Sequence, residues 1–261
     1  MIGVFDSGLG GLSVLAALID VLPRADFHYF ADTAHVPYGN KSEDQIQGRV
    51  LAIGEHLVQQ GCGLLVVACN TATAAAVQAL RAAHPGIPVV GVEPGIKPAA
   101  LATKSGRIAV LTTESTASSQ RLQRLIREHA GQVEVFIEPC PGWATHVETL
   151  QLDDPLLAAD VHARIEPLLE QGVDHIVLGC THYSFLAPLL RDVIGARAQL
   201  VDVADAVARQ TQRLAGPLAH GEGRLQLHAS AHPERLHAAL PRLHLAHIGA
   251  RISGPVSVAA R

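Results

Sequence analysis

The sequence predicts an α/β protein made of two similar lobes, each built on a parallel β-sheet. Short apolar runs alternate with longer helical patterns, and one half of the chain repeats the pattern of the other. Apolar strands that alternate with helices are typical of a parallel sheet covered on both faces. The length of 261 residues suits one large α/β domain or two domains of about 100–150 residues.

Each predicted strand is a short apolar run, and helical patterns fill the segments between the runs. Strands are expected at 2–5, 27–31, 64–68, 89–92, 108–112, 133–137, 175–178 and 199–201. Helices are expected near 12–25, 42–60, 71–83, 96–103, 115–130, 143–148, 155–171, 184–193 and 203–215. The segment "GPLAHGEGRL" is interpreted as a loop, and "GPVSVAAR" as a frayed chain end.

The internal repeat defines the expected domain organisation. "LVQQGCGLLVVACNT" (57–71) matches "LLEQGVDHIVLGCTH" (168–182), and shorter matches precede both segments. A repeat of this size indicates two similar domains that arose by duplication. We predict a first lobe of residues 1–95 plus about 208–261, a second lobe of 96–207, and an active site in the cleft between them.

Composition restricts the compartment and the partners. Hydrophobic residues make up 48% of the chain and charged residues 17%, and the net charge is -4. Without a basic stripe, nucleic acid is not an expected partner. The sequence has no apolar run of membrane-spanning length and no signal-peptide pattern, so we expect a cytoplasmic protein without a membrane partner. The sequence leaves the oligomeric state open, with a homodimer as the candidate.

Two of the four cysteines occupy matching places. Cys69 and Cys180 each end an apolar run and precede a helical segment, whereas Cys62 and Cys140 are interpreted as small buried hydrophobic residues. Open parallel sheets bind ligands at the carboxyl ends of their strands. Polar or reactive residues follow the strands there: Asp6, Ser7, Asp32, Cys69, Asn70, Thr71, Cys180, Thr181 and His182.

Two thiols that face one cleft suit the inversion of a carbon stereocentre. A base removes a proton from one face, an acid returns a proton to the other face, and the reverse reaction exchanges the two roles, so no cofactor is needed. A free thiol has a pKa of about 8.5, so holding it as a thiolate at pH 7 costs about 2 kcal/mol. Asp6 beside Cys69, His182 beside Cys180, and the helix start after each cysteine are the expected sources of help.

Three further motifs are ambiguous by themselves. "DSGLGGLSVL" (6–15) either exposes backbone N–H groups to an anion or makes a tight turn, and Ser13 excludes a dinucleotide fingerprint. In "HVPYGNKS" an exposed Tyr38 offers a hydroxyl and Gly39 an N–H group. Trp143 is interpreted as a packing residue, and Glu148 is by spacing an ordinary helix-face carboxylate.

The histidines do not predict a metal site. Six of them crowd the C-terminal part without a metal-ligand spacing: His220, His228, His232, His237, His244 and His247. We interpret most of them as solvated surface residues and expect neither a metal nor a cofactor.

Together the motifs resemble those of the glutamate racemases, in the cofactor-independent aspartate/glutamate racemase superfamily. The matching segments are "GVFDSGLGGLSVL" (3–15), "PYGNKS" (37–42), "ACNTATA" (68–74), "GVEPGIKPA" (91–99) and "LGCTHY" (178–183). They span most of the chain in the family's order, and the resemblance thins after about residue 215.

The resemblance implies an isomerase that interconverts L- and D-glutamate and supplies D-glutamate for peptidoglycan, and hence for cell-wall biogenesis and cell shape. It implies that Cys69 acts on the α-hydrogen of the D-enantiomer and Cys180 on that of the L-enantiomer. Asp6 and His182 would tune the thiols, and Glu148 resembles the family's assisting carboxylate. The implied substrate contacts are Asp6, Ser7, Tyr38, Gly39, Asn70, Thr71, Ser115, Thr181 and His182.

The chain departs from the family pattern at a few positions. Ser184 stands where a proline usually follows "GCTHY", Leu111 replaces a glycine, and Ser115 replaces the binding threonine. Because Ser115 keeps a hydroxyl, we expect weaker binding rather than none.

Three other functions stay open. The substrate of a racemase could be another amino acid such as aspartate, or a hydantoin. A thiol hydrolase would need only Cys180 as the nucleophile and His182 as its base. A duplicated α/β binding module would bind a ligand without turnover.

Overall fold

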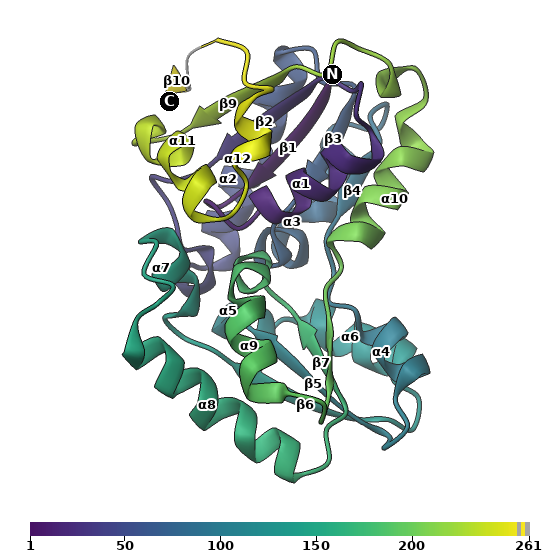
Figure 1. Ribbon diagram of the computed structural model, residues 1–261. Helices are drawn as coiled ribbons and strands as arrows, with labels where there is room; N and C mark the ends of the chain where they lie inside the picture. The colour runs from purple at the N-terminus through teal and green to yellow at the C-terminus, as the bar shows by residue number, and fades with distance from the viewer. Residues whose placement is uncertain (255–256, 259–261) are drawn as a thin grey trace.

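The computed structural model describes residues 1–254 and 257–258, and it shows two lobes stacked one above the other (Figure 1). Each lobe holds one parallel sheet with helices packed around it. The predicted fold class, two α/β lobes with parallel sheets, is therefore confirmed. The residue limits of the two domains stay a prediction.

The first lobe contains a six-stranded sheet in the order β10-β9-β2-β1-β3-β4, and every strand pair is parallel. Its strands are β1 (Ile2–Asp6), β2 (Phe27–Ala31), β3 (Leu64–Val67), β4 (Val89–Gly91), β9 (Leu225–Ala229) and β10 (Ser257–Val258). β1, β2 and β3 are buried along their whole length. Helices on both faces explain why their sequences are continuous apolar runs.

The second lobe contains a four-stranded parallel sheet in the order β6-β5-β7-β8. Its strands are β5 (Arg107–Thr112), β6 (Glu134–Pro139), β7 (His175–Leu178) and β8 (Gln199–Val201). This order repeats β2-β1-β3-β4 of the first lobe strand for strand. The sequence repeat therefore corresponds to two equivalent folding units, in which β3 and β7 hold the same place.

Helices connect the strands and cover the sheets (Figure 1). The α-helices are α1 (Leu12–Val21), α2 (Glu43–Gln59), α3 (Asn70–Ala83), α4 (Ile96–Ala102), α5 (Glu114–Ala117), α6 (Gln120–His129), α7 (Trp143–Glu148), α8 (Pro155–Glu170), α9 (Ala187–Ile194), α10 (Ala204–Ala215), α11 (Pro233–Arg242) and α12 (Ala246–Gly249). The 3-10 segments are η1 (Tyr38–Asn40), η2 (Thr181–Leu186) and η3 (Gly216–Ala219). Among the described residues no helix combines the length and apolarity that a membrane crossing requires.

Two predicted helices differ from the structure for local reasons. The expected helix 115–130 is two helices, because the Ser119 side chain accepts the Leu122 N–H and starts α6 anew. The expected helix 184–193 begins later, since η2 occupies its first part and Pro188 lies in the first turn of α9.

The C-terminal part holds structure that the sequence analysis did not predict. β9 begins at Leu225, where a loop was expected to end, and it pairs with β2. α11 and α12 follow it. Within the expected frayed end at 254–261, residues 255–256 and 259–261 lie outside the described part of the chain. Of the six C-terminal histidines, five are exposed, which confirms the surface interpretation of most of them, and His228 is half-buried.

Candidate active site

Cys69 and Cys180 follow equivalent strands, β3 and β7, at the junction of the lobes. Cys69 directly precedes α3, and Cys180 directly precedes η2. Both are nearly buried, with 5% and 7% of their surface exposed. Asn70 lines a cavity of about 10 Å³ together with Cys180 and Thr181, which is about the space for one water molecule. The fold thus brings the two cysteine segments to one place.

The Cys69 thiol lies among neutral and acidic groups. It donates a hydrogen bond of 3.9 Å to the Ser7 hydroxyl, and the Ala72 N–H in the first turn of α3 reaches its sulfur. Burial raises the pKa of Cys69 well above its ordinary value, and negative charge at Asp6 and Cys180 raises it further. Since the Ala72 and Ser7 contacts only partly oppose this rise, Cys69 is a protonated thiol in this arrangement.

The expected help of Asp6 to the Cys69 thiolate stays a prediction, and it depends on the protonation state of Asp6. Its carboxylate is 1% exposed and accepts the Gly8 N–H at 2.6 Å and the Thr181 hydroxyl at 3.2 Å. Burial raises the pKa of Asp6, and the positive charge of His182 partly opposes the rise. An ionised Asp6 repels a thiolate, so any help to Cys69 requires a protonated Asp6.

Cys180 lies beside a charged chain of contacts. Its sulfur is 3.6 Å from Nδ1 of His182, and Nε2 of His182 is 2.5 Å from Oε1 of Glu148. Burial alone lowers the pKa of His182, but its contacts with Cys180 and Glu148 outweigh burial and hold the pKa well above 6.5. The imidazolium form of His182 therefore lies next to the Cys180 sulfur.

The glycine-rich turn after β1 provides close contact between the lobes. Leu9 N–H donates to Glu148 at 2.6 Å. A Cβ atom on Gly8 would lie 2.1 Å from Oε1 of Glu148, and one on Gly10 would lie 2.4 Å from Nδ1 of His182. Both glycines are therefore required by the close approach of second-lobe side chains.

Tyr38 is buried, so the prediction of an exposed tyrosine is wrong. It is 2% exposed, and its hydroxyl donates to Asp32 at 2.6 Å. Arg49 donates to both oxygens of the same carboxylate, which holds the pKa of Asp32 below its ordinary value despite burial. The phenol ring packs in the same apolar cluster as Cys69. Tyr38 thus forms part of the apolar packing around Cys69.

Thr71 meets hydroxyl groups of the second lobe. Its Oγ1 is 3.1 Å from that of Thr113 and 3.2 Å from that of Thr116. Ser115 instead lines an open groove of about 1300 Å³, together with Gly39 and Thr71. The sequence analysis missed Thr113 and Thr116, although both follow β5 at its carboxyl end, where ligand-binding residues are expected.

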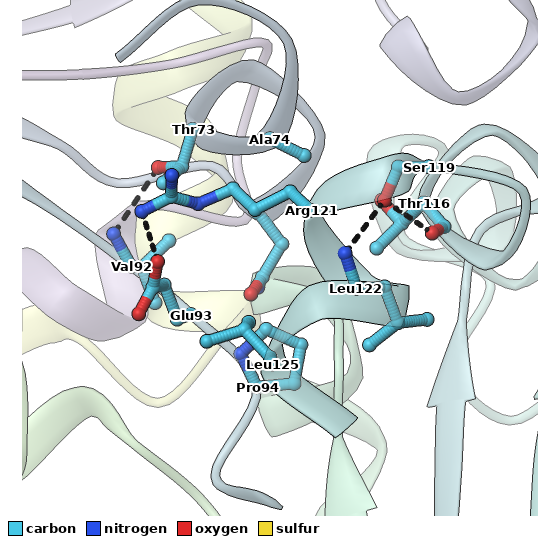
Figure 2. A pocket seen from close by; sticks show the side chains of 11 residues that line it. Thr73, Ala74, Val92, Glu93, Pro94, Thr116, Ser119, Arg121, Leu122 and Leu125 are labelled. Carbon is cyan, nitrogen blue, oxygen red and sulfur yellow. Dashed lines mark hydrogen bonds and ion pairs between the residues drawn. The ribbon is translucent and has the colours of Figure 1, made fainter. Parts of the chain in front are cut away.

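The side chain of Asn70 has unused hydrogen-bonding capacity. It is 4% exposed, and neither its amide nitrogen nor its oxygen has a partner in the described part of the chain. It also lines a second cavity of about 10 Å³, which Figure 2 shows with the Thr116 side chain and the Arg121–Glu93 ion pair around it. A buried amide without partners is costly, so Asn70 is suited to contact a polar ligand.

The remaining singled-out residues are structural. Trp143 is buried, donates from Nε1 to Asp160 at 2.7 Å and packs edge-on against Tyr183. Cys62 and Cys140 are buried free thiols. These observations confirm the packing interpretations.

The molecule thus combines two equivalent α/β lobes with one buried cysteine from each at their junction. The model of the Asp/Glu/hydantoin racemase family matches residues 2–211. The chain belongs to this family, and it is an isomerase of the racemase type.

Individual relatives agree with this assignment. A glutamate racemase from Pseudomonas aeruginosa is 46% identical over 246 residues, which cover 93% of each chain. The crystal structure of a glutamate racemase isoform from Bacillus anthracis has a TM-score of 0.85 at 30% identity, covering 98% of this chain and 96% of that one. A glutamate racemase from Escherichia coli, in complex with L-glutamate and the activator UDP-MurNAc-Ala, has a TM-score of 0.83 at 33% identity, covering 93% and 94%.

Proposed function

We propose that the protein is a glutamate racemase that interconverts L- and D-glutamate and supplies D-glutamate for peptidoglycan. The observation that carries the proposal is the placement of Cys69 and Cys180 after equivalent strands at one junction. The identity to glutamate racemases over most of the chain supports glutamate as the substrate.

In the proposed reaction the two thiols exchange one role for the other. Cys180, as a thiolate beside the His182 imidazolium, removes the α-proton of L-glutamate, and the Cys69 thiol delivers a proton to the opposite face. The reverse reaction uses Cys69 as the base. The Ala72 N–H and the Ser7 hydroxyl group then support its thiolate.

Polar groups around the thiols are proposed to hold the substrate. Asn70 offers an unpartnered amide, and Ser7, Thr71 and Thr181 offer hydroxyl groups that can bind carboxylate oxygens. Such donors also stabilise the negative charge that develops when the α-proton leaves. Since both cysteines are nearly buried, entry of glutamate requires the Leu9–Glu148 and Thr181–Asp6 contacts between the lobes to open.

The test uses purified protein, one enantiomer of glutamate and D₂O. We expect the circular dichroism of L-glutamate to decay to zero, with deuterium entering Cα as seen by loss of the α-proton NMR signal. Folded protein that neither racemises nor exchanges either enantiomer would contradict the proposal. The rates on glutamate and aspartate, compared under the same conditions, decide the substrate.

A thiol hydrolase is the second candidate, because Cys180, His182 and Glu148 form a hydrogen-bonded chain of the kind that activates a nucleophile. Such an enzyme does not need the other thiol. Cys69→Ser therefore abolishes racemisation but leaves hydrolysis intact, and Cys62→Ala is the control for loss of a buried cysteine outside the site.

A further inference from the structure

Three histidines lie together in the first lobe. His28 is on β2, His56 on α2 and His228 on β9, and one ring nitrogen of each lies within 4.8 Å of the others. The rings of His28 and His228 are 4.1 Å apart between centroids. The strand register pairs Phe30 with His228, so these two side chains lie on the same face of the sheet, and His28, two residues before Phe30, shares that face. The His56 ring packs against the Phe30 ring on this face.

The interior of the cluster has unused ligating atoms. His28 has no exposed surface, and neither of its ring nitrogens has a hydrogen-bond partner among the described residues. Nε2 of His56 is also buried without a partner there. A buried polar ring without partners is unfavourable unless a ligand satisfies it, because it has lost its contacts with water.

We propose that His28, His56 and His228 bind a zinc ion. In tetrahedral zinc sites the Zn–N distance is about 2.0–2.1 Å, which places ligating nitrogens about 3.4 Å apart. The ring nitrogens now lie within 4.8 Å of one another, and small side-chain movements would bring them to the spacing of about 3.4 Å. Since His56 and His228 are only half-buried, an ion can enter past them and keep a water molecule as its fourth ligand.

The chemistry of the cluster fits this ion. Three imidazoles form a ligand set that late transition metals accept, whereas calcium and magnesium prefer oxygen. Only neutral imidazole binds a metal. Burial, together with the neighbouring His228 and His56, lowers the pKa of His28 to about 3, and burial also lowers the pKa of the other two rings.

The site would connect segments that are far apart in the sequence. β9 lies at the C-terminal end of the chain and β2 near its start, and His56 comes from the helix that packs against them. A zinc ion would therefore crosslink the C-terminal segment to the rest of the first lobe. The expected consequence is greater stability of the first lobe.

The test must separate this site from the catalytic thiols, which can also bind zinc. We therefore use the full-length Cys69→Ser/Cys180→Ser protein after removal of metals with EDTA. Titration calorimetry with ZnCl₂ should show one bound ion, and Co²⁺ should give the visible absorption of a four-coordinate site. Zinc should also raise the thermal midpoint of unfolding.

Two variants in this background assign the ligands. His56→Gln and His228→Gln alter half-buried residues and are expected to fold, and each should weaken zinc binding at least tenfold and abolish the thermal shift. His84→Gln, which alters a histidine paired with Glu55 instead, is the matched control and should bind as the parent does. A parent that binds no zinc, or variants that bind it as the parent does, would overturn the proposal.

Discussion

The surroundings of the two thiols differ although the backbones around them are equivalent. Cys69 and Cys180 each follow the corresponding strand of a duplicated unit and each precede a helical segment. Cys69 has a hydroxyl and a carboxylate beside it, and its pKa is raised. Cys180 has His182 beside it, whose own pKa is raised by Cys180 and Glu148.

The difference teaches that duplication supplied the symmetry of position but not the symmetry of charge. A racemase needs one base and one acid in each half of its reaction, so different charge surroundings of the two thiols are compatible with this chemistry. In the proposed conversion of L- to D-glutamate, Cys180 acts as the base beside the His182 imidazolium, and the raised pKa of Cys69 keeps that thiol protonated as the acid.

Removing one thiol at a time is the strongest test of the comparison. Cys69→Ser and Cys180→Ser should each lower racemisation by about 10³-fold, because a proton donor or acceptor is lost. The remaining thiol should still exchange the α-proton of one enantiomer with D₂O. We expect exchange of L-glutamate in Cys69→Ser and of D-glutamate in Cys180→Ser, followed by NMR. Exchange of the opposite enantiomers would reverse the assignment.

Removing the charge beside Cys180 tests the source of the asymmetry. His182→Gln should lower kcat/KM by about 10²-fold. The loss must be equal for both enantiomers, because the equilibrium constant between them is one. Because a neighbouring cation favours a thiolate, loss of the imidazolium should move the rising limb of the pH–rate profile to higher pH. A profile that stays in place would show that His182 does not support the thiolate.

Most of the fold could be predicted because the central strands are buried on both sides. Their sequences are unbroken apolar runs, which are easily recognised. β9 was missed because only every second residue is buried. Leu225, Leu227 and Ala229 are buried, and the polar residues between them interrupt the apolar run in "LQLHA". The break between α5 and α6 depends on the Ser119 side chain accepting one particular N–H group, which periodicity does not reveal.

The site residues that directly follow strands could be predicted from the sequence. The burial and contacts of other residues could not, because they depend on residues from distant segments. The paired cysteines were found from the repeat alone. The burial of Tyr38 depends on Asp32, which lies at the end of another segment. The meeting of Thr71 with Thr116 likewise depends on how the two lobes face each other. The cluster around His28 was missed because its three members come from distant parts of the sequence.

The close contact between Gly10 of the first lobe and the His182 ring can be disturbed without changing a reactive side chain. Gly10→Ala places a Cβ 2.4 Å from Nδ1 of His182, so the ring must move relative to the Cys180 sulfur. We expect kcat to fall roughly tenfold to 10²-fold, since small misplacements of catalytic groups are costly. Gly48→Ala on α2 is the control, because its new Cβ meets nothing within 4 Å. Equal activity of both variants would show that the contact is unimportant.

The smallest expected effect is on the KM for glutamate, and it distinguishes the hydroxyl group of Thr116 from that of Ser115. Thr116 is 2% exposed and contacts Thr71, whereas the family resemblance assigned binding to Ser115, which lines the open groove. Thr116→Val keeps the shape and removes the hydroxyl, so it leaves Thr71 without one hydrogen bond. We expect KM for glutamate to rise roughly threefold to tenfold, the value of one hydrogen bond. Ser115→Ala should change KM by less than the Thr116 variant does. The opposite order would restore Ser115 as the binding residue and show that the Thr71–Thr116 contact is replaced when substrate binds.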